Sequence, residues 1–299
     1  MTDNLRGSLF MVLAMLGFAI EDVFFKAATG TGDVSAGVGT MLFGVFGTGF
    51  FVLYALWRKE PLVSHTYIEG PLLIRSAFEI LGRLFFALAL AFAPLSTTSA
   101  ILQAAPLVVT LGAALVLKEK VGLRRWVAMS VGFAGVILIL RPTPSGFDAT
   151  AIFAVLGMIG FAGRDLMTRA SPPEVSATQL GILGFLMVFI AGCVITLFET
   201  APFSAPSLPA LTLLMGTGLA GLVGYSALTK AMRTGEVSVV APFRYSRLLI
   251  ALVFAYFVFG ERPDALTLIG ATLIVGSGVY TLVRSGRKVG AGSVPRTGV

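Results

Sequence analysis

Two arginines, Arg244 and Arg247, stand inside an apolar stretch, residues 237–259, that is long enough to cross a membrane. At about 1.5 Å per residue from Glu236, both lie roughly 12–16 Å along the helix, near mid-depth. A charge facing lipid there costs at least about 2.5–3.5 kcal/mol. The two share one helix face, and Pro242, which cannot donate a backbone hydrogen bond, favours a kink just before them. This pattern predicts a polar cavity within the membrane that could bind a carboxylate.

Neither arginine has an acid within one turn of its own helix, so the partners must come from another helix or from a ligand. The candidates are Glu79, Asp22 and Asp165, and a role in a cavity is favoured over a purely structural pair. Glu79 and Arg83 are four residues apart on the apolar stretch 70–93. They could neutralise each other locally or line the cavity, and the spacing does not decide between the two.

Asp22 and Asp165 stand near the ends of their apolar stretches, toward opposite faces of the membrane. Each is followed four residues later by a cation, Lys26 or Arg169, so anchoring of helix ends is the favoured interpretation. The alternative is that a carboxylate in one of these stretches binds and releases a proton and so couples a conformational change to proton movement. This requires a carboxylate whose protonation changes with conformation. The coupling candidates are Glu79, Asp22 and Asp165, of which Glu79 is the best placed.

Other polar and aromatic side chains on these stretches complete the candidate site. Tyr225 and Tyr245 lie inside their stretches rather than at the ends, where tyrosine often anchors. Phe78 and Phe243 flank the charges and could stack on a planar ligand, although lipid-facing filler is the commoner role of phenylalanine. The candidate substrate-binding residues are Arg244, Arg247, Tyr245, Glu79, Arg83, Gln103, Tyr225, Phe78 and Phe243. The candidate gating positions, at expected kinks and flexible points, are Pro106, Pro242, Gly82 and Gly224.

The elements that must position these residues are apolar helices. Hydrophobic residues make up 56% of the chain and charged ones 12%, against about 45–50% and about 25% in soluble domains. Short connections with charges or prolines separate ten candidate spans: 7–28, 35–57, 70–93, 96–117, 122–140, 149–168, 175–198, 208–232, 236–259 and 265–284. The Gly/Ser-rich, basic tail 286–299 is expected to be disordered. The sequence thus predicts an all-α integral membrane protein with ten transmembrane helices in a single membrane domain, 1–299.

Charge distribution predicts the orientation. With the N-terminus inside, the outer segments carry only Lys26, Arg141 and Arg262 among the lysines and arginines of the connections. Because cytoplasmic loops are enriched in Lys and Arg, both termini are predicted to be cytoplasmic, in a multi-pass protein of the inner (plasma) membrane.

The two halves of the chain, 7–140 and 149–285, repeat. The segment Gly17-Phe18-Ala19 with Asp22 recurs 143 positions later as Gly160-Phe161-Ala162 with Asp165, and Gly82 matches Gly224 at a shift of 142. Each half has five spans, an odd number, so the second must insert upside down relative to the first. We therefore expect two inverted five-helix repeats with a site at their interface.

In each half a charged turn precedes a glycine-patterned span: Glu119 with Gly132 and Gly135, and Glu261 with Gly276 and Gly278. With these motifs, residues 7–285 resemble the drug/metabolite transporter superfamily, most closely its ten-helix EamA-type branch. The resemblance implies a secondary transporter similar to exporters of aromatic and other amino acids. Relatives in that superfamily also carry S-adenosylmethionine, nucleotide sugars or sugar phosphates. Lys118 departs from the glycine that is more frequent before the glutamate, and the arginine pair is not a general feature of the family.

Enzymatic functions are disfavoured. The chain has no G-x-x-x-x-G-K-[ST] phosphate loop and no HExxH or CxxC motif, and His65 and Cys193 are its only histidine and cysteine. We expect no metal, no cofactor and no nucleic acid partner. The net charge of +7 does not by itself indicate a nucleic acid partner, because its distribution over the connections between the spans matters more than its sum. A catalytic pair of aspartates, as in an intramembrane enzyme, could be formed only by Asp22 and Asp165. Their expected placement near opposite faces of the membrane disfavours this role.

The sequence therefore favours a transporter, most simply an exporter, of small amphipathic or zwitterionic metabolites. Amino acids, aromatic ones included, are the leading substrate class, and membrane lipid is the other partner. In the alternative, the same fold carries S-adenosylmethionine or a phosphorylated metabolite. A membrane receptor or scaffold without flux is the alternative of another class. Proton exchange and facilitated diffusion both remain open.

Overall fold

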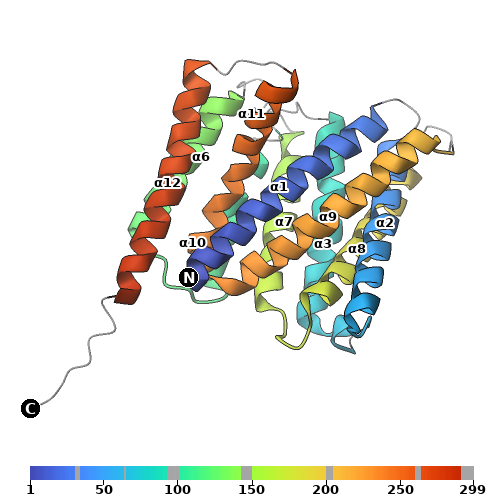
Figure 1. The fold of residues 1–299 in the computed structure, drawn as a ribbon, viewed down its shortest axis with the longest axis horizontal. Helices are drawn as coiled ribbons and strands as arrows, with labels where there is room; N and C mark the ends of the chain where they lie inside the picture. Colours follow the sequence, from blue (N-terminus) through green and yellow to red (C-terminus); the bar gives the residue numbers. More distant parts are fainter. Residues whose placement is uncertain are drawn as a thin grey trace, which may run out of the picture.

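A computed structural model describes residues 1–30, 34–63, 65–92, 98, 101–142, 150–199, 205–259 and 264–290. All the elements it describes are helices (Figure 1). Their bounds are α1 Asp3–Thr29, α2 Ala36–Arg58, η1 His65–Ile68, α3 Gly70–Phe92, α5 Ala105–Leu115, α6 Leu123–Leu140, α7 Ala151–Ala170, α8 Ala177–Phe198, α9 Leu208–Thr234, α10 Val237–Val240, η3 Ala241–Tyr245, α11 Ser246–Phe259 and α12 Ala265–Gly290. Seven of the described helices are long and apolar enough to cross a membrane, which confirms an all-α membrane protein.

The span that carries the two arginines is broken. It runs as α10, the 3-10 turn η3 and α11, and Pro242 lies in the first turn of η3. The kink expected there is therefore present, because proline withholds one backbone donor. The carboxylate of Glu119 accepts hydrogen bonds from the backbone N–H groups of Val237 at 3.2 Å and Ser238 at 3.5 Å. A side chain of the first half thus caps the start of this span.

Pro106 does not kink a continuous helix. Described residues 103–104 form a turn, and α5 begins at Ala105 with Pro106 in its first turn, where a missing N–H removes no helical bond. The expectation of a kink inside the span 96–117 is corrected accordingly. Residues 96, 97, 99 and 100 lie outside the described part of the chain.

The contacts between the two halves of the chain are reciprocal. α1 packs against α9 and α7 packs against α3, so the first helix of each half meets the third helix of the other (Figure 1). A Cβ built on Gly17 would lie 2.7 Å from the Cα of Gly224, and one on Gly160 would lie 2.5 Å from the Cα of Gly82. Gly82 and Gly224 therefore permit close helix approach at matching crossings.

The second helices of the halves, α2 and α8, also pack together. Ser35, the N-cap of α2, donates to Glu199 at the end of α8 at 2.5 Å. Ser176, the N-cap of α8, donates to Glu60 just after α2 at 2.9 Å. The helix pair is therefore fastened at both ends by the same kind of contact.

The N-terminus and the end of α12 lie at the same end of the bundle (Figure 1). α12 ends at Gly290, so residues 286–290 are helical and do not belong to the expected disordered tail. Residues 291–299 of that tail lie outside the described part.

Candidate functional site

Both arginines of the broken span pair with acids from other helices. Arg244 in η3 donates to Asp165 in α7, and Arg247 in α11 donates to Asp22 in α1, its Nε at 3.1 Å. The two aspartates occupy matching positions in the repeat, so one span is tied to the first helix of each half. Anchoring of Asp165 beside Arg169 is not what the structure shows, because Arg169 donates to the carbonyl of Met232 at 3.2 Å.

The two ion pairs differ in exposure. Side-chain exposure is 14% for Arg244 and 1% for Asp165, but 39% for Arg247 and 54% for Asp22. Charges exposed this far inside a span are tolerated where they face a water-filled opening rather than lipid. Arg244 and Arg247 are only three residues apart, so the aspartates that pair with them, Asp165 and Asp22, meet the same short part of the broken span. This differs from the expected placement of the two aspartates near opposite faces of the membrane.

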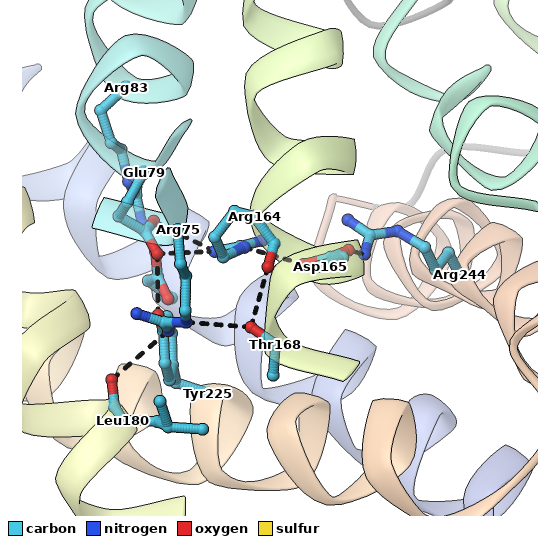
Figure 2. A network of polar contacts seen from close by, with 10 residues as sticks. Arg75, Glu79, Arg83, Arg164, Asp165, Thr168, Leu180, Tyr225 and Arg244 are labelled. Atoms are coloured by element: carbon cyan, nitrogen blue, oxygen red, sulfur yellow. Dashed lines mark hydrogen bonds and ion pairs between the residues drawn. The ribbon is translucent and has the colours of Figure 1, made fainter. Parts of the chain in front are cut away.

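Glu79 lies at the centre of a buried network (Figure 2). Its carboxylate is fully buried and accepts from Arg164 Nη1 at 3.1 and 3.3 Å and from the Tyr225 hydroxyl at 2.7 Å. Arg164 Nε also donates to Asp165 at 2.8 Å. The order Glu79, Arg164, Asp165, Arg244 alternates negative and positive charge from α3 through α7 to η3.

Of the two alternatives left open for Glu79 and Arg83, local neutralisation of one by the other is not what the structure shows. Arg83 instead lies 3.9 Å from a carboxylate oxygen of Glu21 in α1, and over the rings of Phe43 at 5.4 Å and Phe161 at 5.8 Å. Spacing of four residues allowed the contact with Glu79, but Arg164 from the neighbouring helix takes both oxygens of that carboxylate.

Three charged residues of this region, Arg75, Arg164 and Glu21, were not among the site residues expected from the sequence. Arg75 is fully buried; it donates to Thr168 at 3.0 Å, to the carbonyl of Leu180 at 3.4 Å and to the Tyr225 hydroxyl. A signal was present, because Arg75, Glu79 and Arg83 recur every four residues and so share one face of α3. Arg164 holds the repeat position of Glu21, with opposite charge.

Several other expected residues lie apart from this network. The buried Tyr245 hydroxyl faces the carbonyl of Met129 in α6 at 3.5 Å, and Phe243 packs against an apolar cluster of α1, α5 and α9 residues. Phe78 packs against Gly163 at the crossing of α3 and α7. Gln103 is half-buried in the turn before α5. Only Tyr225 among the expected tyrosines joins the charges.

Two polar contacts outside the spans fix the connections. Arg141 donates to both oxygens of Asp264 at 2.6 Å, and the backbone N–H of Thr267 donates at 2.9 Å, which together hold the pKa of Asp264 below its ordinary value. Burial raises the pKa of Tyr67 to about 12, so its hydroxyl stays a donor to the carbonyls of Leu62 and Gln179. Among the described residues, no group of three or more His, Cys, Asp or Glu could hold a metal ion.

Comparison with known proteins decides the family. The model of the EamA-like transporter family matches residues 5–141 and again residues 149–283. This chain belongs to that family. Members are transporters rather than enzymes, and the protein is accordingly a multi-pass membrane transporter of a small molecule.

Relatives with different cargoes are similar to this chain. An S-adenosylmethionine uptake transporter of Rickettsia bellii is 28% identical over 238 residues, covering 78% of this chain and 77% of its own. A riboflavin transporter of Vibrio cholerae is 28% identical over 274 residues, 91% of each chain. A pseudopaline exporter of Pseudomonas aeruginosa is 25% identical over 270 residues, 90% of this chain and 93% of its own. A protein of known crystal structure, 17% identical, shares the fold with a TM-score of 0.77 over 93% of this chain and 97% of that one.

Proposed function

We propose that this protein is a secondary transporter of the bacterial inner membrane in which two inverted five-helix repeats alternate access to a central site. Three features support the arrangement. Glycines meet at matching helix crossings, Gly17 with Gly224 and Gly160 with Gly82; α2 and α8 exchange reciprocal Ser–Glu contacts; and the family matches once in each half. An inverted pair of repeats can exchange conformations, so that the site opens to either face in turn. Both termini would be cytoplasmic, following the charge asymmetry of the connections.

The substrate class follows from one observation, a group of four charged residues that we call the open cluster: Glu21, Asp22, Arg83 and Arg247. It brings two acids and two arginines together, and two of these side chains are more than one-third exposed. Phenylalanine rings support the arginines, with Arg247 5.8 Å from the Phe18 centroid and Arg83 over Phe43 and Phe161.

A zwitterion presents one charge of each sign, so it can meet an arginine with its carboxylate and an acid with its ammonium group. By contrast, the buried network around Glu79 is occupied by its own contacts and would serve as a fixed support. This moves the expected substrate site from Arg244 toward Arg83 and Arg247.

The leading substrate is a metabolite that joins an amino-acid end to a planar ring, such as S-adenosylmethionine, which relatives are named for carrying. Free amino acids, aromatic ones included, form the second class, because they offer the same zwitterionic end. Riboflavin, named for other relatives, has the ring without the zwitterion and so separates ring recognition from charge recognition.

The experiment is uptake into liposomes containing the purified protein. Labelled S-adenosylmethionine, phenylalanine, riboflavin and a sugar phosphate would be tested one by one, with protein-free liposomes as control. We expect uptake of S-adenosylmethionine, phenylalanine or both, and each should inhibit the other. Riboflavin uptake alone would remove the zwitterion proposal, and binding of a compound without any flux would favour the receptor alternative.

A further inference from the structure

Glu21 is a buried carboxylate whose hydrogen bonding is incomplete. It is 6% exposed, and its Oε1 lies 3.9 Å from Arg83 Nη2, beyond ordinary hydrogen-bond distance. Among the described residues, its Oε2 has no hydrogen-bond partner, and neither does the buried Nε of Arg83. Buried polar groups are normally hydrogen-bonded. Here an acceptor oxygen of Glu21 and a donor N–H of Arg83 both lack a hydrogen-bond partner among the described residues.

Glu79, the best placed of the three coupling candidates named from the sequence, is in the opposite condition, because both of its oxygens have hydrogen-bond donors. Both of its oxygens accept from Arg164, and one also accepts from Tyr225. A proton on Glu79 would displace contacts that are already made, whereas a proton on Oε2 of Glu21 displaces none. The geometry therefore favours Glu21 for reversible protonation.

The charged groups that act on Glu21 are Arg83 from α3, Arg247 from α11, Arg164 from α7 and the adjacent Asp22. Arg247 is engaged by Asp22, and Arg164 by Glu79 and Asp165. The packed faces of α2 and α9 add no charge, since residues 36–57 and 208–229 contain no Asp, Glu, Lys or Arg. Arg83 is thus the nearby cation that remains to balance the negative charge of Glu21.

We propose that Glu21 is the proton-binding site that couples transport, and that proton and substrate bind together; this rests on the proposed transport function. The proton adds to a Glu21 oxygen from one side of the membrane and leaves to the other side, with no other bond made or broken. When Glu21 is neutral, Arg83 loses its competing anion and can bind the carboxylate of a zwitterionic substrate. A metal ion is a poorer occupant, because the described residues offer no group of three or more ligating side chains.

Infrared spectroscopy tests the site without any substrate. Above pH about 5.5, where ordinary carboxyls are ionised, the wild type should show a protonated-carboxyl band that Glu21→Gln lacks. The matched control Glu69→Gln, at an exposed connection, should keep it. A band that persists in Glu21→Gln, or no band in the wild type, would overturn the proposal. If Glu21→Gln does not fold, Arg83→Gln removes the nearest cation and should preserve the band to higher pH; an unchanged titration would also overturn it.

Flux supplies the second arm, with labelled S-adenosylmethionine as probe. An acidic exterior should drive accumulation by the wild type. Glu21→Gln, which mimics the neutral form, should retain counterflow exchange but accumulate nothing in response to the gradient. Gradient-driven accumulation equal to wild type would refute the coupling role. If the wild type moves no S-adenosylmethionine at all, the proposed substrate fails, and the infrared titration still decides the protonation of Glu21.

Discussion

Arg164 is the residue on which the buried network should depend most. Its side chain is 6% exposed and bridges Glu79, which is fully buried, and Asp165. Replacing it by Met would leave Glu79 with Tyr225 as its remaining donor and Asp165 with Arg244. Because removing one partner of a buried pair costs about 3–5 kcal/mol, we expect Arg164→Met to lower the free energy of unfolding by that amount.

The assay is equilibrium unfolding in mixed micelles, arranged as a double-mutant cycle with Glu79→Met. Removing both charges leaves one fewer unpaired group, so the double variant should lose less than the sum of the single losses, by about 0.5–3 kcal/mol. The matched control is Arg58→Met, whose pair with Glu60 is 3.5 Å long with the arginine 54% exposed; it should change stability by less than about 1 kcal/mol. Additive losses, or an Arg164→Met variant as stable as this control, would refute the network.

The remaining predictions concern the fold. Gly160→Ala places a methyl group 2.5 Å from the opposite backbone and should destabilise by about 1–3 kcal/mol, whereas Gly49→Ala, with nothing within 4 Å, should not destabilise in the same unfolding assay. For topology, an impermeant thiol reagent on intact cells should label Ala205→Cys and spare His65→Cys in a Cys193→Ser background; the reverse pattern would contradict cytoplasmic termini.

Strong local signals made part of the site predictable from sequence. A charge inside an apolar span is costly to expose to lipid, and no acid lay within a turn of Arg244 or Arg247, so their partners had to come from another helix or from a ligand. The structure shows Asp165 and Asp22 in those places. The break at Pro242 followed in the same way from a missing backbone donor.

The pairing of Glu79 could not be predicted, because spacing along one helix says only which neighbours are able to meet. Arg164 reaches both oxygens of Glu79 from another helix, and this contact depends on how closely α3 and α7 approach at Gly82 and Gly160. Glu21 was missed for a related reason, since its incomplete hydrogen bonding is a property of the packed structure.

The most direct test of the account is the concentration dependence of S-adenosylmethionine uptake by Arg83→Gln in liposomes, beside the wild type and Glu69→Gln. If Arg83 receives the substrate carboxylate, its loss should raise KM at least about tenfold, as expected for a charge-assisted contact worth roughly 1.5–3 kcal/mol. Glu69→Gln should match the wild type. An Arg83→Gln variant that folds and transports with unchanged KM would contradict the placement of the substrate at the open cluster.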